Sequence, residues 1–145
     1  MIDDIDKKIL DALIRNSRLP IKELAEQVGL SSPSVSERLR RLEERGVIRG
    51  FTIEVDPRAF GYLIEAMVRI RALPGKMHVV QKLLQEIPEF TECDKVTGDD
   101  CFIARLHVRS IEQLDRILDD LAEKAQTSSA IVKAKPIERR LPPLD

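Results

Sequence analysis

Residues 31–46 have the sequence SSPSVSERLRRLEERG and predict a helix with one apolar stripe. Three apolar residues recur at helical spacing: Val35, Leu39 and Leu42. We expect Ser32 to cap this helix, Pro33 to occupy its first position and Gly46 to end it. The stripe therefore faces a core, and the remaining surface faces solvent.

The polar surface of this helix is rich in hydroxyl and guanidinium groups, which can contact phosphates and base edges in a DNA major groove. The candidate DNA-binding residues are Ser32, Ser34, Glu37, Arg38, Arg40 and Arg41. A solvated amphipathic helix carries the same pattern, so this helix alone does not establish DNA binding. The segment before it strengthens the case.

Residues 20–30 predict a second short amphipathic helix. Its apolar residues are Ile21, Leu24, Ala25 and Val28. Ala25 is small enough for two helices to cross closely, Gly29 can take positive φ in the turn, and Leu30 fills the angle between the helices. A helix, a tight turn with glycine and a Ser-rich helix start form the helix-turn-helix pattern.

The flanking segments complete this N-terminal module. Residues 4–16 predict a first helix that Asp3 or Asp4 can cap. Residues 47–55 are rich in β-branched residues and favour a strand or a short wing. Residues 57–61 then predict a linker or a short helical turn.

Overall composition indicates a soluble globular protein, with 43% hydrophobic and 34% charged residues. The net charge of −1 is unlike that of nucleic-acid binders that are basic throughout, so the case for DNA rests on the motif. No apolar run approaches membrane-spanning length. Asp3, Asp4 and Asp6 stand where a signal peptide needs basic charge, so we expect a cytoplasmic protein.

Residues with metal or catalytic potential are few. Cys93 and Cys101 lack the spacing of a metal site and are expected to be free thiols. His78 and His107 have no carboxylate or cysteine at ligand spacing, which favours solvated or structural roles. We therefore expect no catalytic site, no metal and no cofactor.

The second half of the chain has a different hydrophobic periodicity, which predicts an α+β domain. Its expected order is strand 62–72, helix 79–87, strand 90–97, strand 101–109, helix 111–121 and strand 130–137. This βαββαβ order is that of a ferredoxin-like sandwich, whose sheet carries helices on one face only. Leu63 and Met67 lie on the other face, so dimerisation through that open face is expected. The expected domains are 1–55 for the helix-turn-helix with its wing, 56–61 for a linker and 62–145 for the ferredoxin-like part.

The combination resembles the leucine-responsive/asparagine regulator (Lrp/AsnC, or feast/famine) family. The resemblance is carried by RLRRLE at residues 38–43, GVI at 46–48 and IDKKIL at 5–10, followed by the βαββαβ unit. It implies a transcription regulator that binds double-stranded DNA and responds to an amino acid through its C-terminal domain. It also implies a homodimer that assembles further, often to an octamer.

The resemblance further implies an effector pocket near a subunit interface. In the family, the hairpin after the second strand reads Gly-x-aromatic-Asp; here Gly98 matches, but Asp100 replaces the aromatic residue and Cys101 replaces the aspartate. A run similar to Thr-x-Thr is found at residues 127–129. The candidate effector-binding residues are Thr97, Gly98, Asp99, Asp100, Cys101, Thr127 and Ser129. A plain hairpin turn explains the first segment equally well.

Two other functions remain open at this point. Sirohaem decarboxylases join a helix-turn-helix to a ferredoxin-like domain, and a histidine facing a large cavity would favour such an enzyme. A purely structural interaction module would show no sequence-specific DNA binding. The basic, Ser-rich third helix favours a DNA-binding regulator over both.

Overall fold

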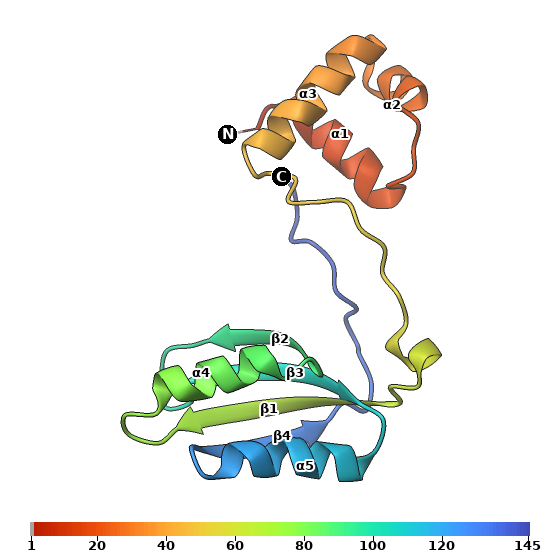
Figure 1. Ribbon diagram of the computed structural model, residues 1–145. Coiled ribbons are helices and arrows are strands. Elements are labelled where there is room, and N and C mark those ends of the chain that lie inside the picture. Colours follow the sequence, from red (N-terminus) through yellow and green to blue (C-terminus); the bar gives the residue numbers. More distant parts are fainter. Residues whose placement is uncertain (1) are drawn as a thin grey trace. The chain divides into compact units, whose positions relative to one another are not determined.

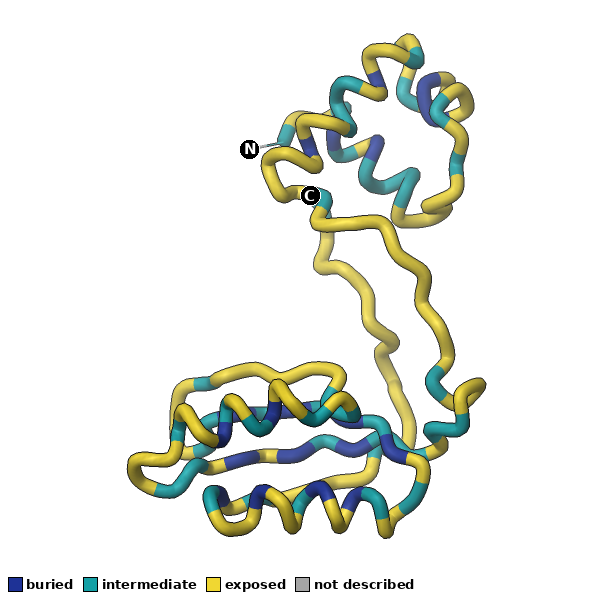
Figure 2. The backbone as a smooth tube through the Cα atoms, in the orientation of Figure 1, coloured by how far each residue is buried: buried dark blue, intermediate teal, exposed yellow. Residues whose placement is uncertain are grey.

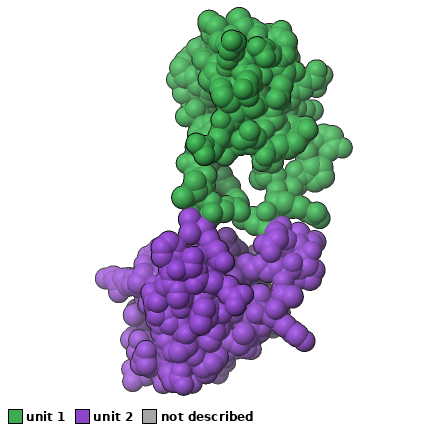
Figure 3. Space-filling view, turned by 90° about the vertical axis from the view of Figure 1, so that its right-hand side faces the viewer, with its two compact units in different colours: residues 1–54, 139–145 green, residues 55–138 purple. Residues whose placement is uncertain are grey.

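The computed structural model describes residues 2–145 and divides the chain into two compact units, residues 1–54 with 139–145 and residues 55–138 (Figure 3). Residues 139–145 are grouped with the first unit. Within that unit, Arg139 Nη1 lies 3.6 Å from the Glu54 carboxylate. None of the helices within residues 2–145 is both long and apolar enough to cross a membrane.

The first unit contains three helices around one small core (Figure 1). They are α1 (Asp4–Arg15), α2 (Ile21–Val28) and α3 (Ser32–Glu44). All three predicted helices are confirmed. The buried core residues come from each helix: Ile9, Leu24, Ala25, Val35 and Leu42.

The ends of these helices follow the expected signals with one correction. Gly29 ends α2 with φ of 73°, and Gly46 follows α3 with the same φ. The cap of α3 is Ser31 and not Ser32, because Ser31 has extended backbone and its Oγ accepts a hydrogen bond from the Ser34 N–H at 3.3 Å. Pro33 is therefore the second residue of the helix.

Residues 47–55 were expected to form a strand or a short wing, and the structure contains no strand there, so the strand was a wrong prediction. Apart from the half-buried Ile48 the segment is exposed, and the side chains of Phe51 and Ile53 are 55% and 80% exposed. A strand needs a hydrogen-bonded neighbour, and the sheet pairs none of its strands with this segment. The helical turn expected next is confirmed as a 3₁₀ helix, Pro57–Phe60.

The second unit is a four-stranded antiparallel sheet with two helices on one face (Figure 1). Its elements are β1 (Ile64–Ala72), α4 (Met77–Glu86), β2 (Phe90–Lys95), β3 (Phe102–Val108), α5 (Ile111–Ala122) and β4 (Ala125–Ile131). The strand order is β2-β3-β1-β4, so the predicted βαββαβ sandwich is confirmed.

The last strand was expected at residues 130–137, which was a wrong prediction. It begins at Ala125, directly after α5, and ends at Ile131. Its sequence AQTSSAI is mostly polar because β4 is an edge strand with most of its residues exposed. Residues 132–137 of the expected strand therefore lie beyond it.

The two faces of the sheet differ in character. Ala66, Val68 and Ile70 of β1 have no exposed surface and pack toward the helices (Figure 2). The intervening residues of β1 face the open side, where Glu65 pairs with His107 and Met67 with Arg105. Met67 is half-buried on this side, as expected, but Leu63 precedes β1 and is 62% exposed. The open face is therefore charged as well as apolar.

Candidate nucleic-acid interface and effector hairpin

The exposed face of α3 presents several of the candidate DNA-binding residues together. Ser34 is exposed, and the side chains of Arg40 and Arg41 are 55% and 66% exposed. Ser32 is half-buried at the first turn. The apolar stripe of Val35 and Leu42 fixes this face outward, because both residues are buried in the core. The helix thus offers hydroxyl and guanidinium groups to solvent.

Glu37 holds the two exposed arginines at the helix surface. Its carboxylate accepts hydrogen bonds from Arg40 Nε at 3.0 Å and from Arg41 Nε at 3.3 Å, and Arg40 also pairs with Glu44. The hydrogen bond from Arg40 lowers the pKa of the Glu37 carboxyl below its ordinary value. Such exposed pairs are weak and exchange readily, so DNA phosphates can compete with Glu37 for both guanidinium groups.

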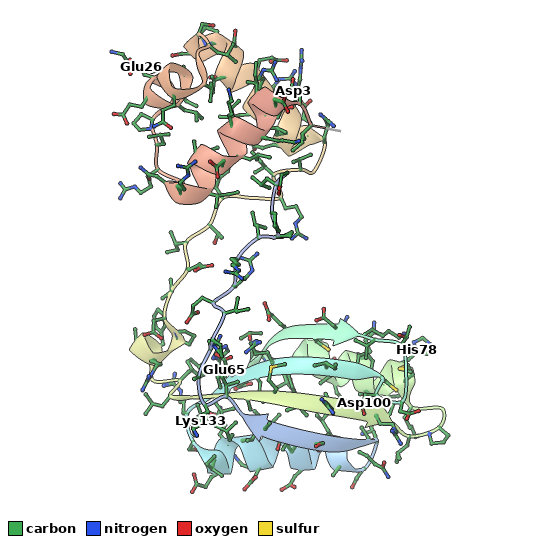
Figure 4. The ribbon with its side chains drawn as sticks, turned by 180° about the vertical axis from the view of Figure 1, so that it is seen from behind. Asp3, Glu26, Glu65, His78, Asp100 and Lys133 are labelled. Carbon is green, nitrogen blue, oxygen red and sulfur yellow. The ribbon has the colours of Figure 1, made fainter. Side chains whose placement is uncertain are left out.

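Arg38 departs from the expectation that it points outward to DNA. Its Nη1 donates to Asp3 Oδ2 at 2.7 Å and to Asp6 Oδ1 at 3.0 Å, at the start of α1, where Figure 4 labels Asp3. Only 28% of the Arg38 side chain is exposed. The hydrogen bond from Arg38 lowers the pKa of the Asp3 carboxyl. The structure places this arginine between two helices.

The candidate effector hairpin connects β2 to β3 and is tied to β1. Cys101 N–H donates to the Ile70 carbonyl at 2.9 Å, and Val96 N–H donates to the Cys101 carbonyl at 3.0 Å. Arg71 Nε donates to the Asp99 carbonyl at 3.0 Å. Arg71 was missed by sequence reasoning, since nothing in its local pattern places it beside a loop 28 residues away. Figure 4 shows the position of Asp100 in this hairpin.

Gly98 lies at the tip of the hairpin with φ of 102°, a backbone conformation that side chains other than glycine rarely adopt. Space beside its Cα is open, with no heavy atom within 4 Å of the position that a Cβ would take. Thr97, Asp99 and Asp100 surround it, and Thr97 and Asp99 are exposed. The tip therefore exposes backbone groups as well as carboxylates.

Thr127 and Ser129 lie within β4, not before the last strand as expected. They pair with Ile70 and Val68 of β1, whose side chains face the helices, so both hydroxyls lie on the helix side of the sheet. Arg71 lies on the open side. Ile70 thus has Cys101 and Thr127 as neighbours on its two sides. The two hydroxyls lie on the helix side of the sheet, whereas Arg71, which bonds to the hairpin, lies on the open side.

The histidines and cysteines occupy separate places. His78 is exposed in the first turn of α4, and His107 lines a cavity of about 420 Å³ together with Phe60 and Tyr62. His107 Nε2 lies 3.9 Å from the Glu65 carboxylate. Both cysteines are free thiols, as expected. Burial, with the charge of Asp94, raises the pKa of the Cys93 thiol.

Two family models match the chain, one for each half. The model for winged helix-turn-helix DNA-binding domains covers residues 2–49, and the model for the Lrp/AsnC ligand binding domain covers residues 65–142. This chain belongs to the Lrp/AsnC family. The resemblance noted from residues 38–43 and the βαββαβ unit is thereby confirmed, and this Lrp/AsnC protein is a DNA-binding transcriptional regulator with a ligand-binding domain.

Similar proteins agree with this assignment over nearly the whole chain. The transcriptional regulator LrpA of Bacillus subtilis is 38% identical over 143 residues, which cover 93% of this chain and 100% of LrpA. The structure of LrpC from B. subtilis has a TM-score of 0.89 at 27% identity and covers 96% of this chain and 99% of its own. A Neisseria meningitidis transcriptional regulator in complex with L-Met has a TM-score of 0.91 at 23% identity, covering 100% and 98%, and shows the shared fold.

Proposed function

We propose that this Lrp/AsnC regulator contacts DNA through the exposed face of α3, with Arg40 and Arg41 as its main cationic contacts and Ser34 beside them. The observation that carries the proposal is that these side chains are exposed on one helix of a helix-turn-helix unit. Guanidinium groups can bind guanine edges or phosphates in a major groove. Ser32 and Glu37 lie close enough on α3 to complete this surface.

The proposal is tested with a DNA duplex that the unmodified protein selects from a random pool, compared with a scrambled duplex. Arg41→Ala is expected to weaken binding to the selected duplex by about 1–3 kcal/mol. Arg15→Ala removes an arginine of α1 whose side chain is 75% exposed, and it serves as the control. Equal affinities of the Arg40→Ala, Arg41→Ala and Arg15→Ala variants would assign DNA binding to another surface.

We infer that the ligand is an amino acid whose carboxylate binds the hairpin at residues 97–101. The exposed backbone of Gly98 and the nearby guanidinium of Arg71 suit a carboxylate. The match to the Lrp/AsnC ligand binding domain supports binding of a small ligand, and the N. meningitidis regulator of similar fold was solved in complex with L-Met. Because Thr127 and Ser129 lie on the other face of the sheet, they would complete a pocket with the hairpin of a second subunit.

A thermal-shift screen against the twenty amino acids tests this inference, since a ligand of the folded state raises the melting temperature. Gly98→Val forces a strained backbone at φ of 102° and is expected to abolish the shift while leaving ligand-free DNA binding intact. Gly50→Val is a matched control, because Gly50 is exposed and has no positive φ. A full response in the Gly98 variant would leave the hairpin as a plain turn.

We propose a homodimer that assembles further, such as to an octamer, with the open sheet face as one interface. Met67 lies on this face between Arg105 of β3 and Ala130 of β4 and supports self-association. Phe51 and Ile53 are further exposed apolar side chains, but they lie outside the sheet. Sedimentation of the full chain measures its mass. Met67→Arg is expected to shift the chain toward smaller species, and a monomer of the unmodified chain at micromolar concentration contradicts the interface.

We propose that the protein acts in the cytoplasm as a regulator without enzyme activity, metal or cofactor, in line with the regulator names of its relatives. The cavity lined by His107 is the observation that favours the alternative, a sirohaem-decarboxylase-like enzyme. The absorbance spectrum of the purified protein, with and without added tetrapyrrole, separates the two. A tetrapyrrole band that His107→Ala abolishes would favour the enzyme.

A further inference from the structure

A charge-assisted contact joins the middle of α3 to the first turn of α1. Arg38 Nη1 lies 2.7 Å from Asp3 Oδ2 and 3.0 Å from both Asp3 Oδ1 and Asp6 Oδ1. The Asp6 side chain is only 10% exposed, and Arg38 is 28% exposed. Asp6 is the only buried residue among the charged and polar residues that the structure describes. One nitrogen therefore links two carboxylates of another helix in a partly desolvated place.

The two carboxylates are themselves held in place by the backbone of α1. Asp6 N–H donates to Asp3 Oδ1 at 2.8 Å, and Asp3 N–H donates to Asp6 Oδ2 at 3.3 Å. This reciprocal pair is a capping box, which fixes both side chains relative to the helix start. Arg38 is thus bonded to acceptors whose positions α1 determines.

The apolar core contributes packing to the position of α3 but no hydrogen bonds. Its members on α3 are the aliphatic residues Val35, Leu39 and Leu42, and aliphatic packing is non-directional. Charge-assisted hydrogen bonds add geometric specificity to such packing. Arg41 lies about one helical turn after Arg38, so a rotation of α3 about its axis displaces the guanidinium that is proposed to meet DNA.

We propose that Arg38 is a positioning residue of the DNA-binding surface, which sets the orientation of α3 through Asp3 and Asp6 and does not itself contact DNA. The proposal rests on the proposed use of the α3 face in DNA binding. It replaces the expectation that Arg38 contacts base edges. It also assigns a role in specific binding to Asp3 and Asp6, although their negative charges repel DNA phosphates.

The test uses the fact that two effects of the same substitution change DNA affinity in opposite directions. Removing a negative charge from a DNA-binding unit raises affinity for DNA by simple electrostatics, whereas loss of the Arg38 contact lowers it for the selected sequence. Asp6→Asn is therefore expected to weaken binding to the selected duplex by about tenfold and to leave binding to the scrambled duplex unchanged or tighter. Asp4→Asn is the matched control, because Asp4 is in the same turn of α1 and its side chain is 94% exposed.

Arg38→Gln and the Arg38→Gln/Asp6→Asn double variant complete the experiment. If Arg38 acts through Asp6, the double variant binds the selected duplex no more weakly than Arg38→Gln alone, and the salt dependence keeps its slope. Circular dichroism reports the folded fraction of each variant. Equal loss on both duplexes is the result of partial unfolding or of a lost phosphate contact, and either one overturns the proposal.

Two further results also overturn it. One is an Asp6→Asn variant that binds the selected duplex as tightly as Asp4→Asn does. The other is an Arg38→Gln variant whose salt slope falls by about 0.9, the value for one lost phosphate contact. Arg41→Ala, measured in the same assay, shows whether the α3 face binds DNA at all, so failure of the proposed function is separable from failure of the positioning role.

Discussion

Arg71 donates a hydrogen bond from its Nε to the backbone carbonyl of Asp99 at 3.0 Å, which ties the end of β1 to the tip of the β2–β3 hairpin. The side chains of the two residues are 4.0 Å apart at their nearest charged atoms, so their ion pair adds little. The backbone contact is the more important one, because it fixes the loop in which Gly98 takes its positive φ.

Arg71→Ala is therefore expected to loosen the hairpin and to weaken the thermal-shift response to the amino acid that the screen identifies. A lost charge-assisted hydrogen bond corresponds to about 1.5–3 kcal/mol of ligand affinity if the loop must be ordered to bind. Arg69→Ala is the control, because Arg69 is exposed on the same face of β1. Equal responses of the two variants would show that the Arg71 contact does not serve the ligand.

Glu37→Gln is expected to raise DNA affinity by about two- to fivefold, on selected and scrambled duplexes alike. The substitution removes a negative charge from the α3 face and weakens the bonds that hold Arg40 and Arg41. Fluorescence anisotropy with labelled duplexes measures the change, with Glu43→Gln on the same helix as control. A loss confined to the selected duplex would instead indicate that Glu37 accepts a hydrogen bond from a cytosine.

The first unit is expected to lose stability in acid partly through Asp3. Its folded pKa is lowered below the ordinary value of 3.8, chiefly by the hydrogen bond from Arg38. A lowered folded pKa gives stability that is complete above the unfolded pKa and is lost as pH falls through the folded one. Thermal melts from pH 6 down to about pH 2 should therefore fall less steeply for Asp3→Asn. Parallel curves for both proteins would show that Asp3 makes no pH-linked contribution.

The sequence predicted the elements whose periodicity is local. The spacing of Val35, Leu39 and Leu42 predicted the buried face of α3. The apolar residues at every second position of β1, such as Ala66 and Val68, predicted its buried side. Because these patterns depend only on residues close together in the sequence, both elements could be predicted without knowledge of their tertiary contacts.

Features that depend on distant partners escaped prediction. The contact of Arg38 with Asp3 spans 35 residues, and the helical pattern alone placed Arg38 beside the apolar stripe without indicating this partner. Residues 47–55 have strand-like composition but no strand to pair with, and the faces of Thr127 and Ser129 follow from the register of β4 against β1. Register and pairing are tertiary properties that a single sequence does not reveal.

Glu65→Gln is expected to destabilise the second unit by about 1–2 kcal/mol. The Glu65 carboxylate accepts a bond from Lys135 at 3.1 Å and pairs with Arg105, while only 16% of its side chain is exposed (Figure 4). Removing its charge leaves two cations close together without their shared counter-charge. Urea unfolding measures the loss. Glu92→Gln is the matched control, because Glu92 also pairs with Arg105 but is 62% exposed, and its loss is expected to stay below about 0.5 kcal/mol.

The same variant has a pH signature that a packing defect lacks. Burial raises the pKa of Glu65, but the bonds from Lys135 and Arg105 outweigh it and hold the pKa below the ordinary value of 4.5. The stabilisation by Glu65 is therefore complete above that value and is lost as pH falls through the lower, folded pKa. The difference in unfolding free energy between Glu65→Gln and the unmodified chain should shrink in that range. A difference that is constant from neutral pH to about pH 3 would assign the loss to packing and not to the charge of Glu65.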